Sequence, residues 1–172
     1  MTDSTSDVRD AAEALLEPGE EFLTALAAHP PHSSTPAPGA DTSLVRTGVG
    51  GLVMGELLDR YNASTPANTG DASEVPSAFH FWIALTSTRL LFFEGGAIGR
   101  LAKLAREGSP PEFHGEIALA DVLAIEPVDS LEDERLELSF GDGSRATVIC
   151  AHAGEGGAFR LAFEQAKRAT AG

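Results

Sequence analysis

The stretch FHFWIALTSTRLLFFE, residues 79–94, decides the fold class. Residues 79–85 and 90–94 are two runs of aromatic and branched apolar side chains, and the polar residues 86–89 separate them. Two short apolar runs joined by a polar turn predict an antiparallel β-hairpin. The glycines at 95 and 96 end this hairpin, so the chain is expected to be built mainly from antiparallel strands.

The chain after the hairpin repeats the same pattern of apolar runs separated by turn residues. Residues 135–140 alternate apolar and polar side chains, GDGS at 141–144 is a tight-turn sequence, and residues 145–151 return with small apolar side chains. Together with residues 116–119 and 122–128, these segments predict four more strands. Residues 158–169 place Phe159, Ala162, Phe163 and Ala166 on one stripe, which predicts a closing amphipathic helix.

The chain before the hairpin is less regular. We expect a short helix over residues 7–17 in an acidic, solvated N-terminal arm, and a first strand over 21–27. Residues 30–78 contain two loops rich in Pro, Ser, Thr, Asn and Gly, with a predicted helix at 44–61 between them. The organisation is therefore an arm, 1–17, and one domain, 18–172, that carries the insertion 30–78.

The insertion helix has apolar side chains on two sides. Such a helix is expected to be covered on both sides, by its own barrel or by another chain. We therefore take it as the candidate partner-binding surface, although packing on its own domain remains open. Its residues are Val45, Val49, Leu52, Val53, Met54, Leu57, Leu58 and Tyr61.

Four short motifs in this order resemble the bacterial branch of the pleckstrin-homology-like (PH-like) superfold, in its YokE-like and GRAM-like groups. They are PGE at 18–20, ALTSTRLLFF at 84–93, EIALADV at 116–122 and LSFGDGS at 138–144. The resemblance covers about residues 18–170. It implies a seven-stranded antiparallel barrel or sandwich with a C-terminal capping helix, here with a helical insertion between strands 1 and 2. It also implies a non-enzymatic module that binds a protein partner.

Phosphoinositide-binding members of this superfold use basic residues in the loop between strands 1 and 2. Here that loop holds only Arg46 and Arg60, against five acidic residues. Membrane or lipid binding is therefore kept as the alternative function and not as the main one. The only basic cluster is Arg100, Lys103 and Arg106, a candidate anion contact for which a solvated face that balances an acidic protein is the favoured interpretation.

The charge excludes a further class of function. The chain has 12 Lys and Arg against 26 Asp and Glu, a formal net charge of −14, so nucleic acid would be repelled. One cysteine excludes an internal disulfide, and the N-terminus lacks the basic and apolar stretches of a secretory signal. We expect a cytoplasmic protein with an unidentified protein partner, and self-association through the same surface is compatible with this.

Catalytic and cofactor motifs are weak. The glycines at 48–55 match neither a dinucleotide fingerprint nor a Walker loop, because Val53 and Glu56 stand where glycine and lysine are needed. Cys150 and His152, two apart on a strand, form a conceivable nucleophile pair, but Cys150 continues an apolar face. His29 and His32 lack a third ligand, and His80 is isolated. No catalytic residue, metal or cofactor is predicted, and an enzyme using Cys150 and His152 is the second alternative.

Overall fold

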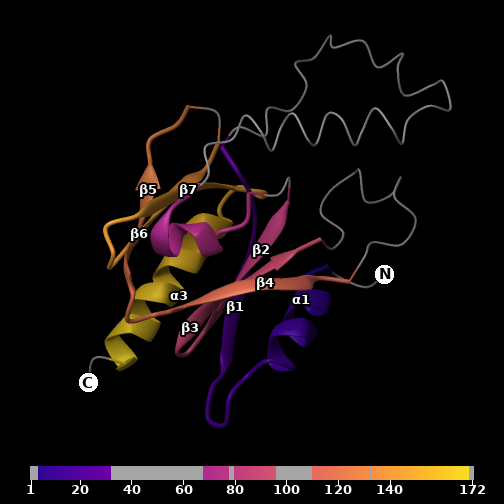
Figure 1. The fold of residues 1–172 in the computed structure, drawn as a ribbon. Helices are drawn as coiled ribbons and strands as arrows, with labels where there is room; N and C mark the ends of the chain where they lie inside the picture. The colour runs from indigo at the N-terminus through magenta and orange to yellow at the C-terminus, as the bar shows by residue number, and fades with distance from the viewer. Residues whose placement is uncertain (1–3, 32–67, 78–79, 96–109, 132, 171–172) are drawn as a thin grey trace, which may run out of the picture.

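The computed structural model describes residues 4–31, 68–77, 80–95, 110–131 and 133–170 (Figure 1). These residues form seven strands, two α-helices and a short 3-10 helix. The helices are α1 (Ser4–Glu13), η2 (Gly70–Glu74) and α3 (Glu155–Thr170). The strands are β1 (Phe22–His29), β2 (Phe81–Thr86), β3 (Arg89–Glu94), β4 (Glu112–Ala118), β5 (Val122–Val128), β6 (Arg135–Phe140) and β7 (Arg145–Cys150).

The strands make one antiparallel sheet in the order β4-β3-β2-β1-β7-β6-β5. The predicted hairpin is confirmed as β2 and β3, with Trp82 opposite Phe93 and Leu85 opposite Leu90. β1 holds the two halves together, because it pairs with β2 along most of its length and with β7 through Ala28 and His29. A mainly β fold with a C-terminal helix is thus confirmed.

Of the expected barrel or sandwich, a closed barrel is not formed, because no ladder between β4 and β5 exists among the described residues. Other elements lie where the closing strand pair would be. The Lys167 ammonium of α3 donates to the carbonyl oxygen of Val122 at the start of β5. Glu74 of η2 packs over Gly115 of β4, where an added Cβ would lie 2.1 Å from Glu74 Oε2. A helix and a 3-10 turn therefore cover these edges in place of strand pairing.

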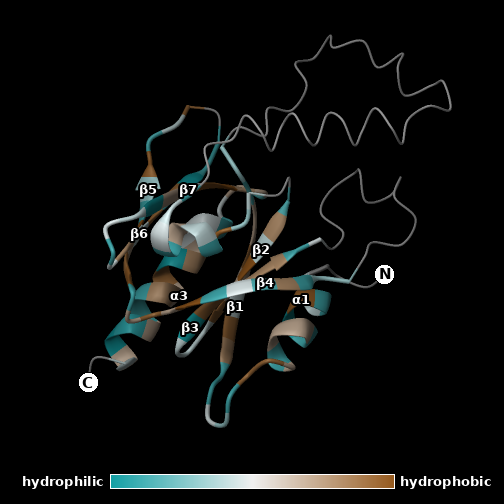
Figure 2. Cartoon of the chain, viewed as in Figure 1, coloured by the Kyte–Doolittle hydropathy of each residue, from teal (hydrophilic) through white to brown (hydrophobic). Residues whose placement is uncertain are grey.

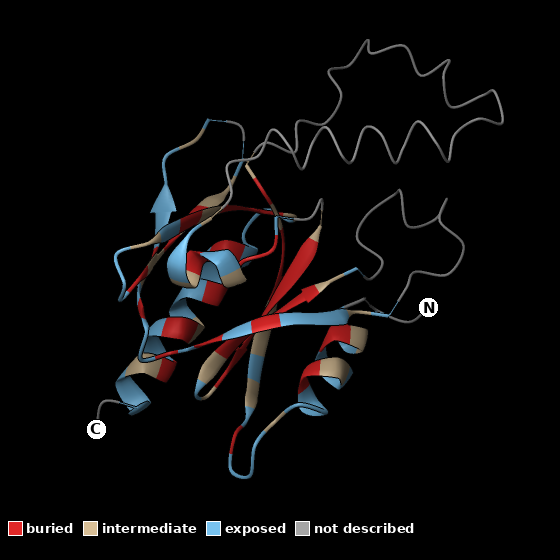
Figure 3. Cartoon of the chain, viewed as in Figure 1, coloured by how far each residue is buried: buried red, intermediate tan, exposed pale blue. Residues whose placement is uncertain are grey.

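Both faces of the sheet carry apolar cores, and the apolar residues that build them recur along the strands (Figure 2). On the inner face, Phe159, Phe163 and Ala166 of α3 join side chains from all seven strands, Ala72 of η2, and Val75 directly after η2. The outer face is covered by α1 and is built from Val8, Ala12, Ala27, Trp82, Ala84, Leu91 and Phe93. All six residues of β2 are consequently buried, which explains why its sequence is apolar without interruption from Phe81 to Leu85 (Figure 3).

The N-terminal helix packs on the sheet and does not stand in solvent as a free arm. Its bounds, Ser4–Glu13, begin and end before those predicted. Val8 and Ala12 are 0% exposed because positions four apart share one helix face, and this narrow stripe sits on the outer core. The acidic composition of the segment describes only its outward face.

The remaining strand predictions agree with the structure to within a few residues. β1 runs two residues further than expected, β4 begins four residues earlier, and β5 and β6 have the predicted bounds. The 3-10 helix η2 was not anticipated, since it lies in a segment rich in turn-forming residues. The predicted insertion helix 44–61 lies outside the described residues. No helix in the described ranges is long and apolar enough to cross a membrane.

Candidate functional site

The sequence-predicted contact residues cannot be placed on this fold. All eight apolar residues of the insertion helix lie outside the described residues. The same holds for the candidate anion contacts Arg100, Lys103 and Arg106. The candidate site features below come from the side chains that the structure describes, and the buried charged side chains are the first of these.

The clearest buried polar cluster joins the turn before β1 to the β2–β3 turn. Glu20 and Arg89 form a two-pronged ion pair, with Arg89 Nε 3.0 Å from Glu20 Oε1 and Arg89 Nη2 2.9 Å from Glu20 Oε2. The hydroxyls of Thr86 and Thr88 donate to Glu20 Oε1 at 2.5 and 2.7 Å. The backbone N–H of Glu17 donates to the other carboxylate oxygen at 2.9 Å.

This cluster is electrostatically satisfied. Burial alone would raise the pKa of Glu20, but the hydrogen bonds from Thr86, the Glu17 backbone, Arg89 and Thr88 outweigh it and lower the pKa to about 2. The guanidinium of Arg89 also donates to the Leu15 carbonyl oxygen at 2.8 Å and to Glu116 at 2.7 Å. The Glu20 carboxylate and the Arg89 guanidinium therefore both have partners within the chain, and neither is directed at a ligand.

Two of the sequence motifs thus meet in space. PGE at 18–20 supplies Glu20, and ALTSTR at 84–89 supplies Thr86, Thr88 and Arg89. Sequence reasoning treated them as separate signatures of one fold and did not foresee the contact. Their chemistry holds the end of the α1 segment onto the hairpin, so we assign them a structural role and not a catalytic one.

The conceivable nucleophile Cys150 is buried beneath the start of α3. It is 7% exposed, and burial raises the pKa of its thiol to about 12, with further contributions from the carboxylates of Glu134 and Glu155. His152 lies beyond the end of β7 and is exposed. The expected shared strand face is therefore absent, and the thiolate that nucleophilic chemistry needs is suppressed.

Glu134 beside that cysteine occupies the N-terminus of α3. Its carboxylate accepts hydrogen bonds from the backbone N–H groups of Gly154 (2.6 Å) and Gly157 (3.0 Å). Free N–H groups at a helix start form a ready anion site. Here the chain fills that site with its own carboxylate, so the position serves to anchor α3.

The predicted GDGS turn has a second task besides reversing the chain. Asp142 accepts the backbone N–H of Asp71 at 2.7 Å, and the Ser144 hydroxyl accepts that of Ala72 at 3.0 Å. These bonds hold η2 over the inner core, where Ala72 is fully buried. The last part of the 30–78 insertion is thereby attached to the β6–β7 turn.

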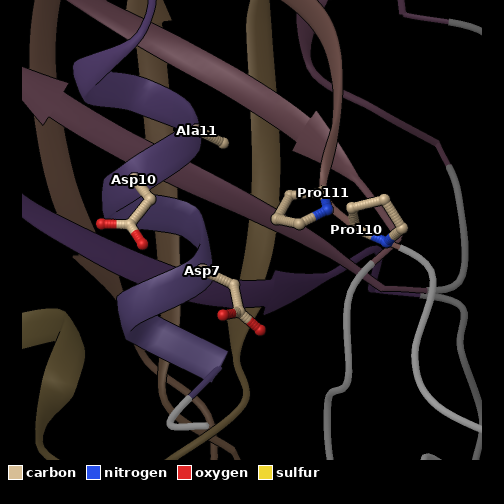
Figure 4. Close-up of a pocket in the computed structure, with 5 residues that line it drawn as sticks. All are labelled: Asp7, Asp10, Ala11, Pro110 and Pro111. Carbon is tan, nitrogen blue, oxygen red and sulfur yellow. The ribbon is translucent and has the colours of Figure 1, made fainter.

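A shallow pocket lies between α1 and the segment that precedes β4 (Figure 4). Its volume is about 430 Å³, and it is lined by Asp7, Asp10, Ala11, Pro110 and Pro111. Asp7 and Asp10 are the only titratable side chains among these lining residues, and no cationic side chain, histidine or thiol joins them there. In the described parts of the chain, no cluster of three or more His, Cys, Asp or Glu is arranged to hold a metal.

Exposed apolar side chains are the remaining unusual surface feature. Leu123 of β5 is 60% exposed, Val128 at its end is 37% exposed, and Leu131 in the following turn is fully exposed. We call these three residues the β5 apolar row. The edge strand β4 exposes Phe113 as well, but it also exposes Glu112, His114 and Glu116, which discourage pairing with another strand.

Comparison with known proteins adds no assignment. No family model matches the sequence, and searches of curated proteins and of solved structures give no significant match.

Proposed function

We propose that the chain is a non-enzymatic protein-interaction module of the bacterial PH-like superfold. The strand order and the helix that follows β7 are compatible with that superfold, and the four motifs support it. The chemistry of the described residues favours binding over catalysis, because the buried carboxylate, guanidinium and thiol are all enclosed in structural contacts.

The β5 apolar row is the observation that carries this proposal. An isolated exposed leucine needs no explanation, but Leu123, Val128 and Leu131 follow one strand and its turn. Pro127 lies within this strand and has no N–H to donate, which disfavours extension of the sheet. The partner is therefore expected to contact the row through side chains.

Lipid binding is less well supported by the described basic residues. Among the described residues, Arg9, Arg89, Arg135 and Arg145 each form an ion pair with a carboxylate of the chain, whereas the exposed Arg160 and Arg168 of α3 do not. A phosphate group would have to compete with these carboxylates for the guanidinium groups. Co-sedimentation with anionic vesicles tests this alternative, and salt-sensitive binding would favour it over the protein-binding proposal.

The double variant Leu123→Asp/Leu131→Asp tests the main proposal. We expect unchanged far-ultraviolet circular dichroism and the loss of a co-purifying protein that wild type retains. The matched control is Arg145→Asp on β7, which alters an exposed charge without touching the row. Retention of every partner by the double variant, with mass unchanged in light scattering, would exclude the row as the interface. A parallel Val49→Asp/Leu57→Asp variant tests the insertion helix.

A further inference from the structure

Three exposed carboxylates accompany the β5 apolar row, and we call them the acidic rim. They belong to Asp121, Glu126 and Asp129. Among the residues that the structure describes, none of these three forms an ion pair with a basic side chain. The rim residues alternate with the apolar ones along the chain, and the end of β5 that carries them is exposed in Figure 3. A partner that covers the row must therefore also meet its charge.

Glu126 shares a face of the sheet with the apolar side chain of Val128. Ile125 is buried in the inner core, and side chains alternate along a strand, so Glu126 and Val128 both lie on the outer face. Glu126 is directly opposite Glu137 of β6, whose carboxylate already binds Arg145 at 2.9 Å. Glu126 therefore has a like charge beside it and no cation of its own.

Basic side chains on the elements beside β5 do not neutralise the rim. Arg135 of β6 binds Asp133, with an N–O distance of 3.2 Å. Lys167 of α3 donates to a backbone carbonyl oxygen at the start of β5. Arg160 and Arg168 are exposed, but they belong to α3, which packs on the inner face of the sheet. The outer side of β5 therefore keeps its negative charge.

The charge of the chain argues against a second copy as the occupant of the row. Residues 121–137 contain seven acidic residues and one basic residue, and the whole chain carries a formal net charge of −14. Two copies that met through this row would bring their acidic rims together, which is unfavourable because like charges repel. The surface instead complements a partner that carries positive charge.

The length of the row fits a helix on that partner. Leu123 and Val128 are five residues apart on an extended strand, which corresponds to about 16 Å. Three turns of an α-helix are also about 16 Å long. One apolar stripe on such a helix can cover the row while basic side chains beside the stripe reach the rim. Pro127 already disfavours the alternative in which the partner adds a strand.

We propose that the β5 apolar row and its acidic rim bind a basic amphipathic helix of another protein. This inference rests on the proposed function and specifies the chemistry of its partner. Apolar side chains of the helix contact Leu123, Val128 and Leu131, and its lysine or arginine side chains pair with the rim. The same rim repels an anionic membrane surface.

Two synthetic peptides with leucine at the same helical positions provide the probes. The remaining positions carry lysine in one peptide and glutamate in the other. Each peptide bears a fluorescent dye, and the full chain is titrated into it while fluorescence anisotropy is recorded. The protein variants change the row, the rim or, as a control with the same loss of charge as the rim variant, the pocket at α1. They are Leu123→Asp/Leu131→Asp, Glu126→Gln/Asp129→Asn and Asp7→Asn/Asp10→Asn.

We expect saturable binding of the leucine–lysine peptide to wild type and to the α1 variant with equal affinity. The row variant should bind at least about tenfold more weakly, although it adds two negative charges that attract the peptide. The rim variant should bind about three- to tenfold more weakly, because each exposed charge pair contributes modestly. The leucine–glutamate peptide should not bind.

The outcomes separate this inference from the proposed function. Equal affinity of the rim variant and wild type, with binding lost in the row variant, would overturn the basic partner and retain the row as a docking surface. Binding that depends on neither the row nor the rim would overturn both proposals. Equal weakening in the α1 and rim variants would indicate general attraction to an acidic chain and would overturn the inference. Binding to anionic vesicles without binding to the peptide would also overturn it. Where the row variant loses its circular dichroism spectrum, Leu123→Ser/Leu131→Ser replaces it under the same criterion.

Discussion

Replacement of Glu20 by glutamine should destabilise the fold strongly. The carboxylate side chain is 2% exposed and binds the Arg89 guanidinium through both oxygens. Its pKa is lowered from 4.5 to about 2, which corresponds to a contribution of about 3 kcal/mol to stability at pH 7. Breaking a buried ion pair by removing one partner costs a similar amount, about 3–5 kcal/mol.

The sign of the pH dependence follows from the lowered pKa. The stabilisation from Glu20 is fully present above the unfolded pKa near 4.5 and is lost as the pH falls through the folded value near 2. The stability difference between wild type and Glu20→Gln should therefore be about 3 kcal/mol at pH 7 and should shrink steadily between pH 5 and pH 2. For a chain of this length, the pH 7 difference corresponds to a fall in Tm of about 6–12 °C.

Urea unfolding of both proteins, followed by circular dichroism at several pH values, measures this difference. The matched control is Glu116→Gln, which removes another carboxylate from the same guanidinium, 2.7 Å away but 48% exposed. Its cost should be within about 1 kcal/mol because solvent screens an exposed pair. Equal losses from the two variants, or a Glu20→Gln loss that does not change between pH 5 and pH 2, would refute the assignment of Glu20 as the buried anchor.

Three further predictions concern α3, η2 and the thiol. Gly156→Ala would place a Cβ 2.7 Å from Glu134 Oε1 and 2.8 Å from Cys150 Sγ, and should cost about 1–3 kcal/mol in thermal or urea unfolding. In contrast, Gly157→Ala has open space and should stabilise the helix by up to about 1 kcal/mol; a loss equal to that of Gly156→Ala would contradict the steric argument. Gly70→Ala combines a φ of +63° with a Cβ only 1.9 Å from a carboxylate oxygen of the β6–β7 turn, so it should release η2 and increase proteolysis there; an unchanged cleavage pattern would count against the anchor. Native Cys150 should resist a thiol reagent at pH 8 and react once urea is added, and rapid native labelling would reopen the enzyme alternative.

Local patterns were sufficient for most of the sheet. The hairpin at residues 81–94, the alternation in β6 and the GDGS turn all depend on neighbours in the sequence, and all were predictable. That the sheet stays open was not predictable, because closure depends on whether α3 and η2 or another strand covers the edges. The burial of α1 was missed for a related reason, since Val8 and Ala12 form a stripe too narrow to stand out among acidic residues.

The contrast between local sequence patterns and contacts between distant segments also explains which features of the site the sequence could reveal. A residue type and its spacing identified Cys150 as a candidate, but only tertiary structure places it under α3 beside Glu134, where burial and charge suppress the thiolate. Conversely, the β5 apolar row carries no local signature, because the exposure of Leu123, Val128 and Leu131 depends on which elements cover β5.

The meeting of two sequence motifs in one ion-pair network changes what those motifs mean for function. In the sequence, the motifs PGE and ALTSTR are two separate signatures of one fold. In the structure, their polar side chains form hydrogen bonds with one another; these side chains belong to Glu20, Thr86, Thr88 and Arg89. The network leaves none of its charged groups for a ligand. A chain could therefore keep all four residues for stability, whatever partner it binds. The residues that determine the partner are therefore expected in the β5 apolar row and in the insertion. Substitutions there should change binding without lowering the free energy of unfolding.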